Sequence, residues 1–149
     1  MKMSIKSISS FILIFLFGCV YFNTFYNAET YFTQALKIIE DTAMEKENEI
    51  PSKAKNLLEK AIDKCNIVLE EFPDSKYVDD AYFIIGKAGF LRREYTIAEK
   101  HFTHIINELP ESEFYKESRI WLAYTLFKTG KVDTALTRFR KIETEKNSR

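Results

Sequence analysis

The segment Phe72–Ser75 (FPDS) is followed 37 residues later by the closely similar segment Leu109–Ser112 (LPES). The residues between these segments keep the same spacing, so that Ala98 matches Ala135. A fixed period of this length is typical of a solenoid of helical hairpins, in which each hairpin is too thin to bury its apolar side alone. The repeat therefore predicts an all-α fold of stacked hairpins.

The residues inside each period resemble the tetratricopeptide pattern. Gly86 and Ala98 stand twelve residues apart, and Phe102 follows four residues later. Ala123 and Ala135 take the corresponding positions of the next unit. Small residues are needed there because the axes of two packed helices approach to about 8–10 Å. We therefore expect an all-α, tetratricopeptide-type helical-hairpin solenoid of about six helices.

The rest of the chain is predicted to extend this solenoid towards the N-terminus. Apolar residues recur with a helical period over residues 20–41 and 53–72, and a polar loop over 41–52 joins these two helices. No long stretch alternates with the period of two that a strand requires. The expected repeat domain is a divergent hairpin at 22–72, followed by repeats at 76–110 and 113–146.

Each proline of the repeat is followed by a short linker that contains a serine and an aromatic residue. Because proline restricts its predecessor and cannot donate a backbone hydrogen bond, it is expected to end the preceding helix. Ser75 and Ser112 are then placed to cap the following helix. Tyr77 and Phe114 are expected to fill the gap between successive hairpins.

The N-terminus carries a second signal. Lys2 and Lys6 precede an uninterrupted apolar run, Phe11–Phe17, which is shorter than the roughly 20 residues that span a bilayer comfortably. The run ends in Leu16–Cys19 (LFGC), which resembles the bacterial lipobox. This resemblance implies a lipoprotein signal peptide at 1–18, a lipid on Cys19 and a mature domain at 19–149. The alternative is an uncleaved membrane anchor whose cysteine is incidental.

These features together resemble the BamD-like outer-membrane assembly lipoproteins. The resemblance rests on the linker Pro73–Tyr82 (PDSKYVDDAY), the 37-residue spacing and the lipobox. It implies a lipid-tethered periplasmic scaffold at the outer membrane, which helps to insert β-barrel proteins by contacting a barrel-forming partner. The segment Cys19–Ala28 (CVYFNTFYNA) also resembles short tetratricopeptide lipoproteins. The alternative function is a structural or regulatory envelope protein, associated with peptidoglycan or division, that self-associates by burying Trp121 and Leu136.

Composition argues against nucleic-acid binding and against several kinds of catalysis. The chain has 22 basic and 22 acidic residues, and removal of Lys2 and Lys6 would leave 20 basic against 22 acidic. The two signs are interspersed along the helices, so no basic stripe is available for nucleic acid. The four glycines are not clustered as a phosphate-binding loop requires. We expect no enzyme activity, no cofactor, no metal and no small-molecule substrate.

Two possible reactive sites also have a structural interpretation. His101 and His104 are three residues apart on one helix, which could begin a metal site, but no third ligand is visible and His101 is expected to face solvent. Cys65 could act as a nucleophile beside a histidine. However, it occupies the repeat position of Phe102, so a buried structural thiol is favoured.

The first helix of each hairpin is expected to line a concave groove that binds a protein partner. Lys87 and Tyr124 are interpreted as surface residues of this groove. Phe90 and Phe127 have two interpretations, because they could equally fill the space between successive first helices. The full set of expected groove residues is Asp80, Phe83, Lys87, Phe90, Leu91, Glu117, Ile120, Tyr124, Phe127 and Lys128.

Overall fold

The computed structural model describes the backbone of residues 5–43 and 50–147, and side-chain surroundings for 23–42 and 50–145. Six α-helices and no strand are found in this part of the chain, which confirms the all-α prediction. The helices are α1 (Ile5–Ala43), α2 (Ser52–Glu71), α3 (Val78–Leu91), α4 (Tyr95–Glu108), α5 (Tyr115–Lys128) and α6 (Val132–Asn147).

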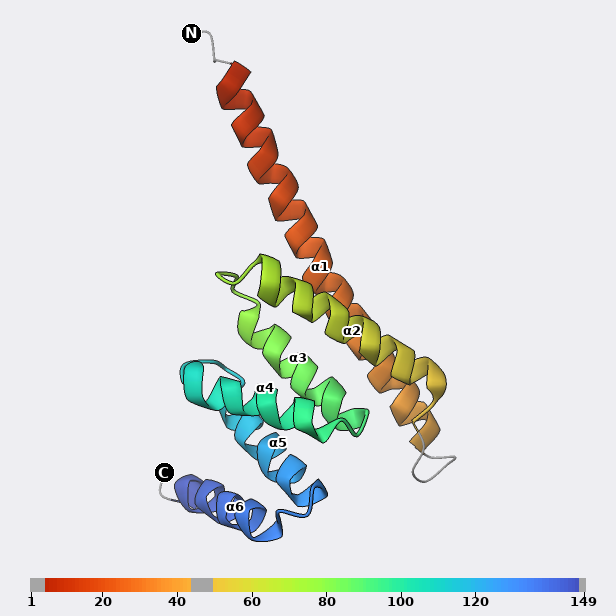
Figure 1. The fold of residues 1–149 in the computed structure, drawn as a ribbon, viewed down its shortest axis with the longest axis vertical. Coiled ribbons are helices and arrows are strands. Elements are labelled where there is room, and N and C mark those ends of the chain that lie inside the picture. The colour runs from red at the N-terminus through yellow and green to blue at the C-terminus, as the bar shows by residue number, and fades with distance from the viewer. Residues whose placement is uncertain (1–4, 44–49, 148–149) are drawn as a thin grey trace.

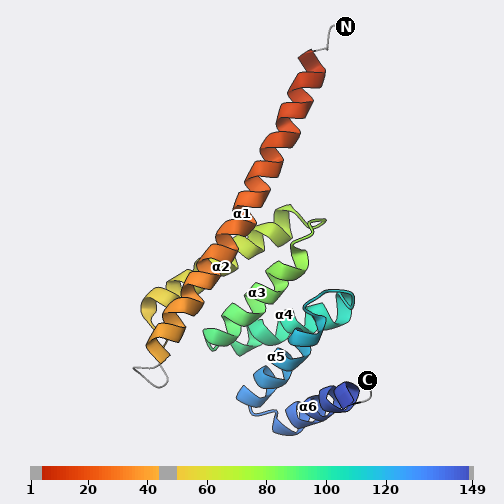
Figure 2. The ribbon, with the colours of Figure 1, turned by 180° about the vertical axis from the view of Figure 1, so that it is seen from behind.

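The six helices form three hairpins that stack one below another, as predicted (Figure 1). Each helix packs against the next one along the chain, and α3 also touches α1 and α5. The first helices of the hairpins (α1, α3 and α5) are called A helices below, and α2, α4 and α6 are called B helices. In both views α1 extends far beyond the other helices, and the C-terminus lies at the opposite end of the stack (Figure 2).

Two core clusters meet at α3. The first joins α1, α2 and one side of α3, and includes the fully buried residues Ala28, Leu58 and Cys65. The second joins the other side of α3 to α4, α5 and α6. Because α3 buries residues in both clusters, no hairpin has a core of its own, as expected for a solenoid.

Small residues stand where the helices of a hairpin cross. Ala98 and Ala135 are completely buried, as the repeat predicted. A Cβ atom added at Gly86 would lie 2.7 Å from the ring of Phe102, so only glycine fits there beside this aromatic ring. The close approach of α3 and α4 therefore depends on the pair formed by Gly86 and Phe102.

The two turns that close the second and third hairpins have the same backbone geometry. Arg93 and Gly130, which are 37 residues apart, both have positive φ angles, of 65° and 80°. In each turn the next residue donates a backbone hydrogen bond five residues back, from Glu94 to Gly89 at 2.8 Å and from Lys131 to Leu126 at 2.9 Å. These bonds satisfy carbonyl groups that the helix end leaves free.

The linkers between hairpins differ in one respect from the prediction. Ser75 and Ser112 do not cap a helix, because each hydroxyl accepts a hydrogen bond from the backbone N–H two residues on, one turn before the helix is established. The aromatic residues fill the gaps as expected. Tyr77 stacks on Phe25 of α1 with ring centroids 4.2 Å apart. Phe114 stacks on Phe83 of α3 with centroids 4.4 Å apart.

The predictions for the N-terminus concern residues that lie largely outside the described side chains. The backbone of α1 continues without a break through residues 18 and 19, where the end of the leader was expected. The side chain of Cys19, the expected lipidation site, is not among those the structure describes. Within the described residues, no helix combines the length and the apolar character needed to cross a bilayer.

Candidate binding surface

The expected groove residues of the second hairpin pack mainly against the third hairpin. Phe83 is buried and stacks on Phe114, and Phe90 meets the ring of Trp121 edge-on with centroids 5.1 Å apart. Leu91 is half-buried against the first core cluster. These three side chains therefore belong to the contacts between helices. For Phe90, the position agrees with the alternative interpretation, in which it fills the space between successive A helices.

Lys87 lies at the centre of the contact between the three A helices. Its ammonium nitrogen is 5.1 Å from the ring centre of Trp121, 5.3 Å from that of Phe83 and 6.0 Å from that of Phe32. It also forms an ion pair with Glu117 at 3.5 Å. A cation held over several aromatic rings is stabilised by their negative faces. Lys87, which was interpreted as a surface residue of the groove, is thus partly buried, with its charge shared between rings of α1, α3 and α5 and the carboxylate of Glu117.

An acidic group lies at the N-terminal end of α3. Asp80 is half-buried and has Asp79, Glu113 and, more weakly, Glu29 as charged neighbours. Partial burial, together with the nearby carboxylates of Asp79 and Glu113, raises the pKa of Asp80 to about 6. A partner that brought a positive charge to this end would relieve the repulsion between these carboxylates.

The expected groove residues of the third hairpin lie in a different environment, because most of them face water. Glu117 reaches back to α3, where it pairs with Lys87, and it accepts a hydrogen bond from the indole of Trp121, one turn further along α5, at 3.0 Å. Ile120, Tyr124 and Phe127 lie along one stripe of α5 and are exposed, and Lys128 is exposed at the end of the helix.

Helix α6 adds two exposed apolar side chains, Val132 and Leu136, which are four residues apart. We call the surface formed by Ile120, Tyr124, Phe127, Val132 and Leu136 the terminal face. Its members are between 38 % and 52 % exposed. Val132 was not identified from the sequence, and Leu136 was considered only for self-association. Their spacing of four along one helix is the signal that could have found them.

A separate hollow of about 430 Å³ lies between α2 and α4, beside Tyr82 of α3. The ring of Tyr82 stacks on His104 with centroids 4.0 Å apart, and it also faces His101. His101 was expected to face solvent, but it is half-buried and its Nδ1 atom has no hydrogen-bond partner. Burial, together with the charges of Lys100 and His104, lowers the pKa of His101 to about 4.

The remaining candidates for chemistry have structural positions. Cys65 is fully buried in the first core cluster, as its repeat position predicted. Burial raises the pKa of its thiol, so the nucleophilic thiolate is disfavoured. No set of three or more His, Cys, Asp or Glu side chains is arranged to hold a metal ion in the described part of the chain.

Comparisons of this chain with protein-family models, with curated proteins and with solved structures find no match.

Proposed function

We propose that the protein is a lipid-anchored scaffold of the bacterial cell envelope, which binds another protein through its helical repeats. The observation that carries this proposal is the terminal face, which groups five of the six exposed large hydrophobic residues found in the described part of the chain, the sixth being Tyr26 of α1. Contiguous apolar patches of this kind are typical of protein-binding sites on soluble domains. Tyr124 and Phe127 are aromatic, and aromatic side chains are enriched in the cores of interfaces.

The tether in this proposal is a lipid on Cys19, and the location is the periplasmic side of the outer membrane. It is supported by the sequence LFGC at Leu16–Cys19, which follows a basic and then apolar leader. The resemblance to the BamD-like lipoproteins extends the proposal to assembly of outer-membrane β-barrel proteins, with a component of that machinery as the partner.

The alternative function is a self-associating structural or regulatory envelope protein. In that case Trp121 and Leu136 were expected to be covered by a second copy. Trp121 already packs against Phe90 and Phe102 of its own chain, with ring centroids 5.1 and 6.3 Å away. Leu136 alone of this pair remains exposed. The geometry therefore favours a scaffold for a different protein.

The test combines the tether and the partner in living cells. A photo-reactive amino acid placed at Tyr124 should form an adduct with a specific envelope protein, whereas the same group at the exposed Asp63 of α2 should not. Cys19→Ser should leave an unlipidated protein and abolish the Tyr124 adduct if the tether positions the scaffold. Equal labelling from both positions, or an adduct consisting only of a second copy, would contradict the proposal.

A further inference from the structure

The contact between the second and third hairpins shows how the apolar side of one hairpin is covered by the next hairpin. The linker and helix α5 place Phe114 on Phe83 and Trp121 against Phe90, with the buried Ser118 between them. Small residues such as Ser118 let the helices approach closely. An aromatic residue, a small residue four positions on and a large apolar residue seven positions on therefore form the covering element.

The same arrangement occurs once more in the chain. Tyr77 stacks on Phe25, Ala81 is completely buried four positions later, and Ile84 is buried seven positions later. The covering element is thus repeated at both contacts between hairpins. Its recurrence predicts the residue pattern of an element that could cover the exposed side of the third hairpin.

The corresponding side of the third hairpin is the terminal face. Shifting covered positions of α3 by the 37-residue repeat takes Phe83 to Ile120 and Phe90 to Phe127. In the third hairpin these positions are exposed, because no element in the described part of the chain covers them. The terminal face therefore continues a contact surface that the chain has already used twice.

The charges at this end specify one feature of the occupant. At the internal contact, Asp79 accepts a hydrogen bond from the hydroxyl of Ser112 at 2.8 Å. The repeat places Lys116 at the position of Asp79, so an occupant must present an acceptor there, best an acidic side chain. At the internal contact, Glu99 also forms an ion pair with Lys131 at 2.8 Å. The repeat places Leu136 at the position of Glu99, so the corresponding contact on the terminal face should be apolar.

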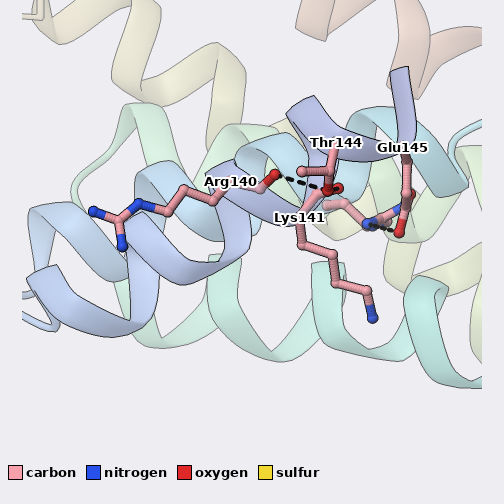
Figure 3. A network of polar contacts seen from close by, with 5 residues as sticks. Arg140, Lys141, Thr144 and Glu145 are labelled. Carbon is pink, nitrogen blue, oxygen red and sulfur yellow. Dashed lines mark hydrogen bonds and ion pairs between the residues drawn. The ribbon is translucent and has the colours of Figure 1, made fainter. Parts of the chain in front are cut away.

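The surroundings of the terminal face have nearly balanced charge, so the preference for acid is local to one position. Lys116, Lys128 and Arg140 are exposed and form no ion pair with another described residue, whereas Asp133 and Glu143 contribute two carboxylates. Figure 3 shows the charged end of Arg140 extended from α6 with no contact drawn to it.

We propose that the terminal face binds an amphipathic helix of a protein partner, with aromatic or large apolar residues seven positions apart, a small residue between them and an acid that meets Lys116. This inference rests on the proposed scaffold function and names the class of partner. A second copy fits less well, because the covering elements of α3 and α5 are already packed. The outward side of α1 offers Asn23, Tyr26 and Thr30 in place of a covering element.

The chain itself supplies a probe for this proposal. A fluorescent peptide of residues 111–128 carries the covering element of α5, and a second peptide differs only by Ser112→Asp. Both should bind the full-length chain in detergent, measured by fluorescence anisotropy. The Asp peptide should bind roughly tenfold more tightly, because a charge-assisted bond to Lys116 replaces a neutral one. The variant Lys116→Glu should reverse this order, and Lys53→Glu on α2 serves as the matched control.

Variants of the apolar centre locate the site. Phe127→Ala should weaken binding roughly thirtyfold if it is a hot spot, and Leu136→Asp should abolish binding. The proposal would be overturned if neither peptide binds, or if binding survives both Phe127→Ala and Leu136→Asp. It would also be overturned if Lys116→Glu leaves the order of the two peptide affinities unchanged. Dimers of the full-length chain in sedimentation that Leu136→Asp dissociates would overturn it as well. An adduct at Tyr124 in cells without peptide binding would contradict this inference alone and leave the scaffold function standing.

Discussion

The pair formed by Gly86 and Phe102 gives a prediction in which one substitution changes the sign of another. In the native protein, Gly86→Ala would place a methyl group 2.7 Å from Cε1 of Phe102 and 3.0 Å from two further ring atoms. The ring is fully buried between Phe83 and Trp121, so it has little room to move away. Overpacking of this kind costs about 1–3 kcal/mol. Replacing a helical glycine by alanine returns about 1 kcal/mol. We therefore expect a net loss of stability of up to about 2 kcal/mol.

Removing the ring should reverse this result. Phe102→Ala alone should cost about 3–5 kcal/mol through the cavity it leaves. In that background, Gly86→Ala no longer meets an aromatic ring, so it should stabilise the protein by about 0.5–1 kcal/mol. The double-mutant cycle should therefore give a coupling energy of about 1–3 kcal/mol, as found for residues in direct contact.

The assay is urea denaturation followed by circular dichroism at 222 nm, with the free energy of unfolding obtained by linear extrapolation. If Phe102→Ala does not fold, Phe102→Leu provides a milder background that also lacks the ring. Gly130→Ala is the control, because nothing lies within 4 Å of the added methyl group and its effect should add independently to that of Phe102→Ala. An effect of Gly86→Ala that has the same sign and size in both backgrounds would refute the packing argument.

Four further predictions concern the turn, two titrating groups and the buried thiol. Gly130→Ala should destabilise the protein by about 1–2 kcal/mol in the same urea assay, because the backbone has a φ of 80° there. Between pH 4 and 6 the folded state binds more protons at Asp80 than the unfolded state does, so this group lowers stability as the pH rises; Asp80→Asn should raise the melting temperature more at pH 7 than at pH 4. His101 has the opposite sign: its lowered pKa means that the folded state loses stability as the pH falls from about 6.5 to 4. The melting temperature of His101→Gln relative to the native protein should therefore be higher at pH 4 than at pH 6.5, and a difference that does not change with pH would contradict the burial of His101. In a Cys19→Ser chain, Cys65 should react with a thiol reagent only after urea is added; fast labelling of the folded protein would show that the first core cluster is open.

The sequence alone determined the helical hairpins and the residues that let them pack. Helical periodicity and the 37-residue spacing are recorded in consecutive residues, so the positions of Ala98 and Ala135 at crossings and the burial of Cys65 could be predicted and are confirmed. The linker aromatics Tyr77 and Phe114 were also assigned correctly. Each of these assignments depends on a pattern within one repeat or on its copy in the next.

Only the tertiary structure decided which members of a repeated position meet water. Phe83 and Ile120 occupy the same position in the repeat, yet Phe83 is buried by the next hairpin whereas Ile120 is exposed. Lysine is a residue type usually found at the surface, but the charge of Lys87 lies among rings of three A helices. The physical reason is that burial is a property of two surfaces in contact. The sequence of one repeat describes only one of them, and the stacking of the helices supplies or withholds the other.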